Sequence, residues 1–179
     1  MHDASLETGG PTLRAARDLH HITIRDMFVV VRVRHKIIVL VGLPGSGKST
    51  WAAQQGAGVL SSDMVRALLT GSEETQTVNR LVFPTLRFLL EMRVKAGAKS
   101  TIIDATSLTA KERRAWIRMA ESLDCDAEAV FFDTPLEICR KRNAARDRRV
   151  PDDVMDRFAA RMTRPAEREG FVKVTSIEP

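Results

Sequence analysis

The segment 42–50, with the sequence GLPGSGKST, constrains the fold of this 179-residue chain more than any other feature. It matches the pattern GxxxxGK[ST], in which a glycine-rich loop between a buried strand and a helix binds nucleotide phosphates (a P-loop). Glycines let backbone amides approach phosphate oxygens closely, and the N-terminus of the following helix adds partial positive charge. The continuous apolar run 36–41 precedes the loop, as this context requires. Because no NKxD guanine signature accompanies the loop, we expect ATP, or another nucleoside triphosphate, as the ligand.

The residue types of the loop predict distinct roles in nucleotide binding. Lys48 is expected to reach the β- and γ-phosphates, and the hydroxyl of Ser49 is suited to Mg²⁺. Asp104 ends the apolar segment 100–104, where a P-loop fold places a second acid near the magnesium, usually acting through water. A strand-end aspartate that caps the next turn is the alternative for Asp104. The other loop positions predicted to contact the nucleotide are Gly45, Ser46, Gly47 and Thr50.

Apolar runs alternate with helical patterns along the rest of the chain. This alternation predicts an α/β fold of the P-loop NTPase type, a parallel sheet with helices on both faces. A helix after Thr109 begins with TAKE, a capping-box pattern, and Pro135 is suited to the first turn of the next helix. Strands are predicted at 36–41, 58–61, 100–104, 127–132 and 171–176, and helices from 48 to about 55, at 63–69, 75–96 and 109–123, from 135 and after about 152.

Basic residues are concentrated in the segment 140–149, which holds six of them and a single acid. The net charge of the whole chain is +5, so this segment accounts for all of it. Arg142, Arg146 and Arg149 have i, i+4, i+7 spacing, which predicts that they share one helical face. In P-loop kinases the segment after the fourth strand commonly forms a lid, so we expect a helical lid at about 140–152 whose arginines neutralise phosphate charge. A solvated face or a nonspecific phosphate-binding patch is the alternative.

Asp63 and Arg66 follow the second predicted strand, within the sequence SSDMVR. The carboxyl ends of parallel strands face the ligand crevice, and residues three apart share one face of a helix. Asp63 is therefore a candidate to accept a proton from an attacking hydroxyl, and Arg66 a candidate to hold phosphate charge. All four histidines precede residue 36 and tyrosine is absent, so a carboxylate is the expected proton acceptor. A helix cap with a surface ion pair is the alternative.

Composition limits the location of the protein and the kind of partner it can have. The two cysteines form no disulfide framework, no apolar run is long enough to span a membrane, and no signal-peptide pattern is present. We therefore expect a cytoplasmic protein without a membrane partner. Aromatic residues make up 5% of the chain, which argues against an extended base-stacking platform. In the segment 75–96 one buried helix face is predicted, formed by Phe83, Phe88, Leu89 and Met92.

Motifs follow one another in a fixed order along the chain: GLPGSGKSTW, VLSSDMVRALL, EETQTV, STIIDATS, DTPLEICRKRNAARDRR and REGF. Together they resemble the kinase module of bacterial polynucleotide kinase-phosphatase enzymes of RNA repair. The resemblance runs from about Lys36 to Thr175, and its most selective parts are the SSDxxR block and the RxxxR spacing of the lid. It implies an enzyme that uses ATP and Mg²⁺ to phosphorylate the 5′-hydroxyl of RNA or DNA.

The resemblance also implies a role for each residue of the site. Asp63 would be the general base, Arg66 would contact the acceptor or the transferring phosphate, and Arg142 would bind phosphate beside Lys48. Arg146 would lie beside the nucleoside. The chain departs from the family at Ser107, within DATS, where an asparagine is common.

The resemblance covers one kinase domain, 36–179, and leaves residues 1–35 as an N-terminal extension. Within the extension, the β-branched segment 27–34 could form an edge strand. We expect no accompanying phosphatase or ligase module, and the sequence indicates no oligomeric state. Two other functions remain open. One is a P-loop kinase of a small molecule (a sugar, nucleoside or antibiotic), and the other is a noncatalytic module that binds ATP or nucleic acid.

Overall fold

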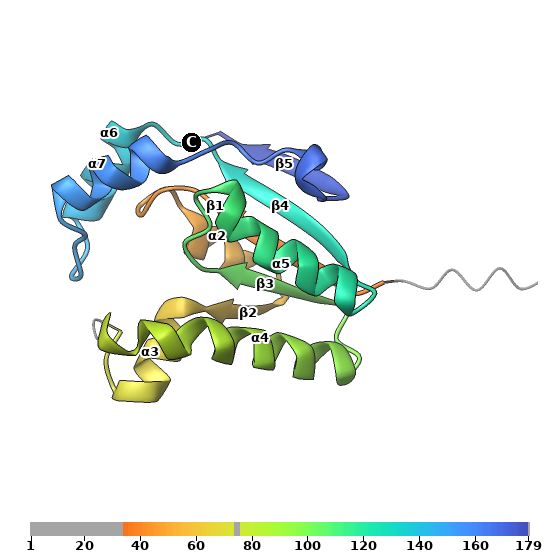
Figure 1. The fold of residues 1–179 in the computed structure, drawn as a ribbon. Helices are drawn as coiled ribbons and strands as arrows, with labels where there is room; N and C mark the ends of the chain where they lie inside the picture. The colour runs from red at the N-terminus through yellow and green to blue at the C-terminus, as the bar shows by residue number, and fades with distance from the viewer. Residues whose placement is uncertain (1–33, 74–75, 179) are drawn as a thin grey trace, which may run out of the picture. The chain divides into compact units, whose positions relative to one another are not determined.

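The structure is a computed structural model that describes residues 34–73 and 76–178. The predicted extension 1–35 and its edge strand lie outside the described residues, except for Arg34 and His35, which are not in a strand. The described strands form one parallel sheet in the order β2-β3-β1-β4-β5 (Figure 1), which confirms the predicted α/β fold of the P-loop type. They are β1 (Lys36–Val41), β2 (Gly58–Ser61), β3 (Ser100–Asp104), β4 (Asp126–Phe132) and β5 (Lys173–Ile177).

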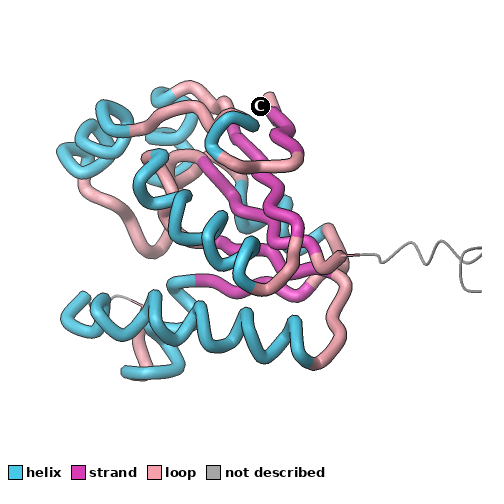
Figure 2. The backbone as a smooth tube through the Cα atoms, turned by 45° about the vertical axis from the view of Figure 1, so that its right-hand side comes forward, coloured by secondary structure: helices cyan, strands magenta, loops and turns pink. Residues whose placement is uncertain are grey.

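Strand β1 lies at the centre of the sheet because it pairs with β3 on one side and with β4 on the other. Its side chains alternate between the two faces, so Ile37 and Val39 pack in one core cluster and Leu40 packs in another. Helices α4 (Asn79–Lys95) and α5 (Ala110–Ser122) cover the first face. Helix α2 (Lys48–Gln54) covers the second, and Figure 2 shows helices on both sides of the strands.

The remaining helices are α3 (Ser62–Thr70), α6 (Leu136–Ala144) and α7 (Asp152–Arg161), with short 3-10 helices η1 (Gln76–Val78) and η2 (Glu167–Glu169). The capping box predicted for α5 is confirmed, because Thr109 and Glu112 each accept a bond from the other's backbone N–H. Pro135 is the N-cap of α6, one position before the first turn where we expected it. Among the described helices, none has the length and apolar character that crossing a lipid bilayer would require.

The prediction of the buried face of α4 is wrong for Phe88. Val82, Leu86 and Leu90 are fully buried and form a stripe of i, i+4, i+8 spacing against the sheet. Phe88 lies midway between Leu86 and Leu90, about half a helical turn from each, so its side chain is 59% exposed. Phe83 is partly buried and packs against the core cluster.

The carboxyl ends of β1 to β4 lie at one edge of the sheet because these strands are parallel. The P-loop follows β1, Asp63 follows β2, Asp104 ends β3, and the lid segment follows β4. The topology thus brings four separate parts of the sequence to a single edge.

Candidate active site

The phosphate loop connects β1 to α2 in a conformation that depends on its glycines. Gly45 has a φ of 81°, and a Cβ atom there would lie 2.4 Å from the carbonyl oxygen of Cys139 in α6. Gly47, with a φ of 101°, is the N-cap of α2. No side chain bonds the first amides of α2, and its first turn carries no acidic residue. The backbone N–H groups at this helix N-terminus are therefore suited to an anion.

Lys48, the first residue of α2, lies over the loop that precedes it. Its Nζ donates hydrogen bonds to the carbonyl oxygens of Gly42 (2.9 Å) and Leu43 (2.7 Å). Burial lowers the pKa of Lys48 to about 8, and the carboxylates of Asp104 and Asp63 act in the opposite direction. The charge on its ammonium is thus sensitive to pH in the physiological range.

Ser49 and Asp104 meet at the edge of the sheet. The hydroxyl of Ser49 donates a hydrogen bond of 2.7 Å to Oδ2 of Asp104. The hydroxyl and the carboxylate supply oxygen ligands of the kind that Mg²⁺ prefers. Mg²⁺ usually takes few ligands from a protein and completes its coordination shell with phosphate and water oxygens. The described residues contain no group of three His, Cys, Asp or Glu side chains that could hold a metal ion.

Asp63 lies in the first turn of α3, where the hydroxyl of Ser61 caps the helix by accepting a bond from the N–H of Asp63. Its Oδ1 pairs with a guanidinium nitrogen of Arg66, as the i, i+3 spacing predicts, and also with Arg148 of the lid at 3.3 Å. Arg66 is further fixed by a bond of 2.9 Å from its Nε to Oδ1 of Asn79. Within the described residues Oδ2 of Asp63 has no hydrogen-bond partner, so one carboxylate oxygen remains available to an acceptor.

The lid differs from the prediction of a single helical face. Helix α6 ends at Ala144, so Arg146 and Arg149 lie in the loop between α6 and α7 and do not share a helical face with Arg142. The reason is the buried side chain of Asn143, which bonds both backbone groups of Val150, at 2.8 Å and 3.1 Å, and closes the loop.

Two of the predicted lid arginines nevertheless lie near the phosphate loop. A Cβ atom on Gly47 would lie 4.0 Å from a guanidinium nitrogen of Arg142. The positive charge of Arg146 contributes to lowering the pKa of Lys48. Arg148, for which the sequence analysis predicted no role, is the lid residue that reaches Asp63. It pairs with the carboxylate of Asp63 and also with that of Glu73, at 3.7 Å.

A buried arginine that the sequence analysis missed supports this edge of the sheet. Arg113 of α5 is fully buried and makes a two-pronged bond to Glu169, at 2.8 Å and 2.7 Å. It also donates to the carbonyl oxygens of Leu108 and Thr163, and so joins the loop after β3 to the segment after α7. Ser107 in that loop is buried too, and its hydroxyl has no hydrogen-bond partner.

A known protein family matches the part of the chain that forms the site. A family model described as AAA_33, an AAA domain, matches residues 37–165. The chain belongs to this family. It is thus a P-loop kinase domain, as the sequence resemblance indicated. The match covers the phosphate loop, Asp63, Asp104 and the lid, so each part of the site lies within the AAA_33 domain.

Curated relatives of this AAA_33 domain are kinases of different acceptors. The chain is 28% identical over 149 residues to a bifunctional polynucleotide phosphatase/kinase of Schizosaccharomyces pombe, which covers 79% of this chain and 33% of that protein. It is 23% identical over 138 residues to an L-seryl-tRNA(Sec) kinase of Methanococcus maripaludis, covering 72% of this chain and 53% of the relative. The chain therefore spans between a third and about half of the length of these relatives.

Solved structures share the fold of the AAA_33 domain at low sequence identity. A chain of the Pnkp1/Rnl/Hen1 RNA repair complex superposes with a TM-score of 0.63 and 20% identity over 72% of this chain and 44% of that one. A sugar kinase from Janibacter sp. HTCC2649 superposes with a TM-score of 0.57 and 18% identity, covering 80% of this chain and 85% of that one. The fold is thus shared with a chain of an RNA repair complex and with a sugar kinase.

Proposed function

We propose that this domain transfers the γ-phosphate of ATP to the 5′-hydroxyl of an RNA or DNA strand. The observation that carries the proposal is the position of Asp63, which follows β2 at the edge of the sheet that carries the phosphate loop and pairs with Arg66 of α3 and with Arg148 of the lid. This position supports Asp63 as the proton acceptor. The similarity to a polynucleotide phosphatase/kinase favours a nucleic-acid acceptor.

In the proposed reaction, the free Oδ2 of Asp63 accepts the proton of the acceptor hydroxyl. The hydroxyl oxygen forms a bond to the γ-phosphorus, the bond to the β,γ-bridging oxygen breaks, and ADP leaves with the electron pair. Lys48 and Arg142 stabilise the negative charge on the phosphate oxygens. Ser49 and Asp104 would hold Mg²⁺, which would supply further neutralisation of phosphate charge.

The proposal is tested by offering the protein γ-labelled ATP, Mg²⁺ and a 5′-hydroxyl oligonucleotide next to a panel of sugars, nucleosides and antibiotics. We expect label to appear on the oligonucleotide. Label that appears on a small acceptor alone would exclude the polynucleotide activity, and no transfer to any acceptor would favour a noncatalytic module.

A kinase of a small acceptor is the second candidate. The same fold occurs in a sugar kinase of similar extent, and Asp63 and the lid would serve either kind of acceptor. Salt distinguishes the two, because binding of a polynucleotide weakens steeply with ionic strength through counterion release and binding of a neutral small acceptor does not.

Nucleotide affinity should depend on pH through Lys48. The free protein holds the pKa of this amine at about 8, and phosphates favour its charged form. Below pH 8 the ammonium is already present, whereas above it ATP must bind together with a proton. We therefore expect the dissociation constant for ATP to be flat up to about pH 8 and to rise towards tenfold per pH unit above it.

The matched variant is Lys48→Met, which carries no ionisable group. Its affinity for ATP should be lower than that of the wild type at pH 7 and should not change between pH 7 and pH 9. Calorimetric titrations with ATP over this range measure both proteins, and a wild-type curve that stays flat to pH 9 would contradict the expectation.

Arg148 should assist phosphoryl transfer by connecting the lid to Asp63. Its ion pairs with Asp63 and Glu73 connect the loop after α6 to α3 and to the segment after it. Replacing it by alanine should lower kcat by about tenfold, because Asp63 and the lid lose a shared contact that fixes their geometry. The KM for ATP should change little. Arg149→Ala is the control, since the side chain of Arg149 donates a hydrogen bond to the backbone carbonyl of Arg146 and pairs with no carboxylate of the described chain.

A further inference from the structure

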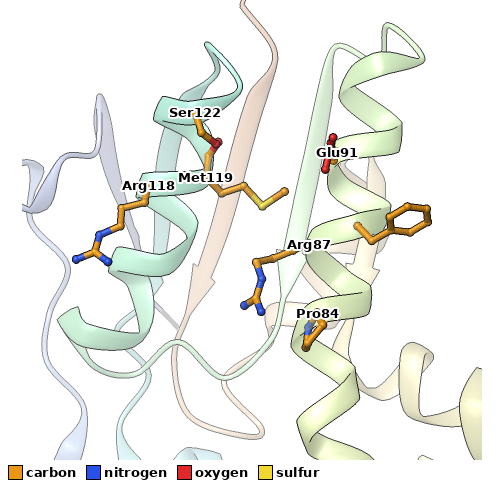
Figure 3. Close-up of a pocket in the computed structure, with 7 residues that line it drawn as sticks. Pro84, Arg87, Glu91, Arg118, Met119 and Ser122 are labelled. Carbon is orange, nitrogen blue, oxygen red and sulfur yellow. The ribbon is translucent and has the colours of Figure 1, made fainter.

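A groove of about 540 Å³ runs between α4 and α5, outside the catalytic edge (Figure 3). Arg87 extends from α4 towards α5, and Met119 extends from α5 towards α4. Arg118 lines the groove at its outer rim on α5, with its side chain directed away from α4, and Pro84 and Phe88 line the groove from α4. The proposed reaction gives no role to these residues.

The groove has an excess of positive charge, because two arginines and one acid line it. Arg87 and Arg118 are exposed, and neither forms an ion pair with any residue that the structure describes. The same helix faces continue towards the catalytic edge with further exposed bases that pair with no acid of residues 34–73 and 76–178: Arg80 on α4, and Lys111 and Arg114 on α5. The acid of the groove, Glu91, lies at its other end and pairs with Lys95 at 2.6 Å.

Helix α4 connects the groove to the site. Helix α4 begins at Asn79, whose Oδ1 accepts the bond from Arg66. Helices that connect parallel strands run antiparallel to them, so α4 and α5 both start at the edge that carries Asp63. Phe88 follows Asn79 by nine residues, which is about 14 Å along the helix axis. A single strand stacked at about 3.4 Å per nucleotide would cover this length with roughly four nucleotides.

The exposed ring of Phe88 adds an apolar contact of the right kind. It is the only aromatic side chain among the large exposed apolar residues of the described chain. Proteins that bind single strands combine a basic groove with aromatic side chains on which bases stack. The composition argues against an extended base-stacking platform, but a single exposed ring is enough to stack on one base.

We propose that the acceptor strand leaves the catalytic edge along this groove, with its backbone phosphates beside Arg87 and Arg118 and one base on Phe88. The inference rests on the proposed function, because it places the 5′ end of the strand at Asp63. It assigns the groove to a single-stranded polynucleotide of more than about four nucleotides, and it leaves shorter acceptors without this contact.

The test compares three proteins: the wild type, the double variant Arg87→Glu/Arg118→Glu, and the control Lys99→Glu/Lys173→Glu. The control changes the net charge equally at exposed lysines outside the groove that have no ion-pair partner among the described residues. Binding of labelled 5′-hydroxyl oligoribonucleotides of about 2 and about 12 nucleotides is measured by fluorescence anisotropy over a salt series, because the shorter strand ends before it reaches Arg87. Phosphorylation of both lengths is measured in parallel, and the affinity for ATP reports that each variant is folded.

We expect the groove variant to bind the longer strand about tenfold more weakly at low salt and to lose about 1.4 from the slope of log K against log salt, 0.7 for each phosphate contact. The shorter strand and ATP should bind as they do to the wild type, and the control should keep its affinity for the longer strand. Equal losses for both lengths, equal losses in the control, or no loss would overturn the inference. So would an acidic peptide such as polyglutamate that displaces the strand and binds more tightly, since the groove would then fit a protein segment.

Failure of the proposed function gives a different result. A wild-type protein that binds the longer strand through Arg87 and Arg118 but phosphorylates neither length would reject the kinase activity and keep the groove. A wild-type protein that phosphorylates both lengths with the same KM as the groove variant would keep the activity and reject the groove.

Discussion

Asp63→Asn is expected to reduce phosphoryl transfer by about 10²- to 10⁴-fold, the range typical for loss of a general base. The amide is isosteric with the carboxylate, so the cap by Ser61 and the local fold of α3 should persist. It cannot accept the acceptor's proton, and it removes the charge that pairs with Arg66 and Arg148. Binding of ATP should change little, because the hydrogen bonds of Lys48 go to the phosphate loop and not to Asp63.

The measurement is turnover of ATP with a 5′-hydroxyl oligonucleotide at saturating acceptor, together with the affinity for ATP. Glu73→Gln is the matched control, since Glu73 is the other carboxylate that pairs with Arg148. It should retain most of the activity. Because phosphoryl transfer through a loose transition state needs little proton removal, a fall smaller than tenfold would assign Asp63 to orientation of the hydroxyl. Unchanged turnover would remove it from the mechanism.

The parts of the fold that sequence predicted well are those set by local chemistry. The sequence pattern of the phosphate loop is specific to that kind of loop. The capping box at Thr109 depends on two residues that are only three positions apart. Strands β1 and β3 have the predicted bounds because each has a buried apolar run that is flanked by polar or loop-forming residues. Asp63 and Arg66 meet because they share a helix turn.

The lid was predicted less well because its geometry depends on contacts distant in sequence. The i, i+4, i+7 spacing of its arginines indicates a continuous helix, but Asn143 bonds Val150 across the loop and the helix ends at Ala144. In the loop that follows this helix, Arg148 forms an ion pair with Asp63, a residue far away in the chain. Nothing in the basic run distinguishes Arg148 from its neighbours before the fold is known.

Arg113 and Arg114 illustrate the same limit within two consecutive residues. Arg113 is fully buried and Arg114 is exposed. One signal could have separated them, because Arg113 lies on the apolar stripe of α5 with Trp116, Ile117 and Ala120, at i+3, i+4 and i+7. A charge on a buried stripe needs a partner, and the acid of the REGF segment supplies it as Glu169.

Arg113→Met is expected to lower the free energy of unfolding by about 3–5 kcal/mol, the loss measured when one partner of a buried ion pair is removed. The methionine fills much of the volume but leaves Glu169 without its two bonds and removes the hydrogen bonds that Arg113 donates to the carbonyl oxygens of Leu108 and Thr163. Chemical denaturation gives the loss directly. Arg114→Met, one position along the same helix, is the control and should stay within about 0.5 kcal/mol of the wild type. Equal stability of the two variants would mean that the pair with Glu169 contributes nothing beyond packing. A large loss for Arg113→Met alone would show that this contact fixes the loop after Asp104 against the segment after α7, and with it the edge of the sheet on which the proposed reaction depends.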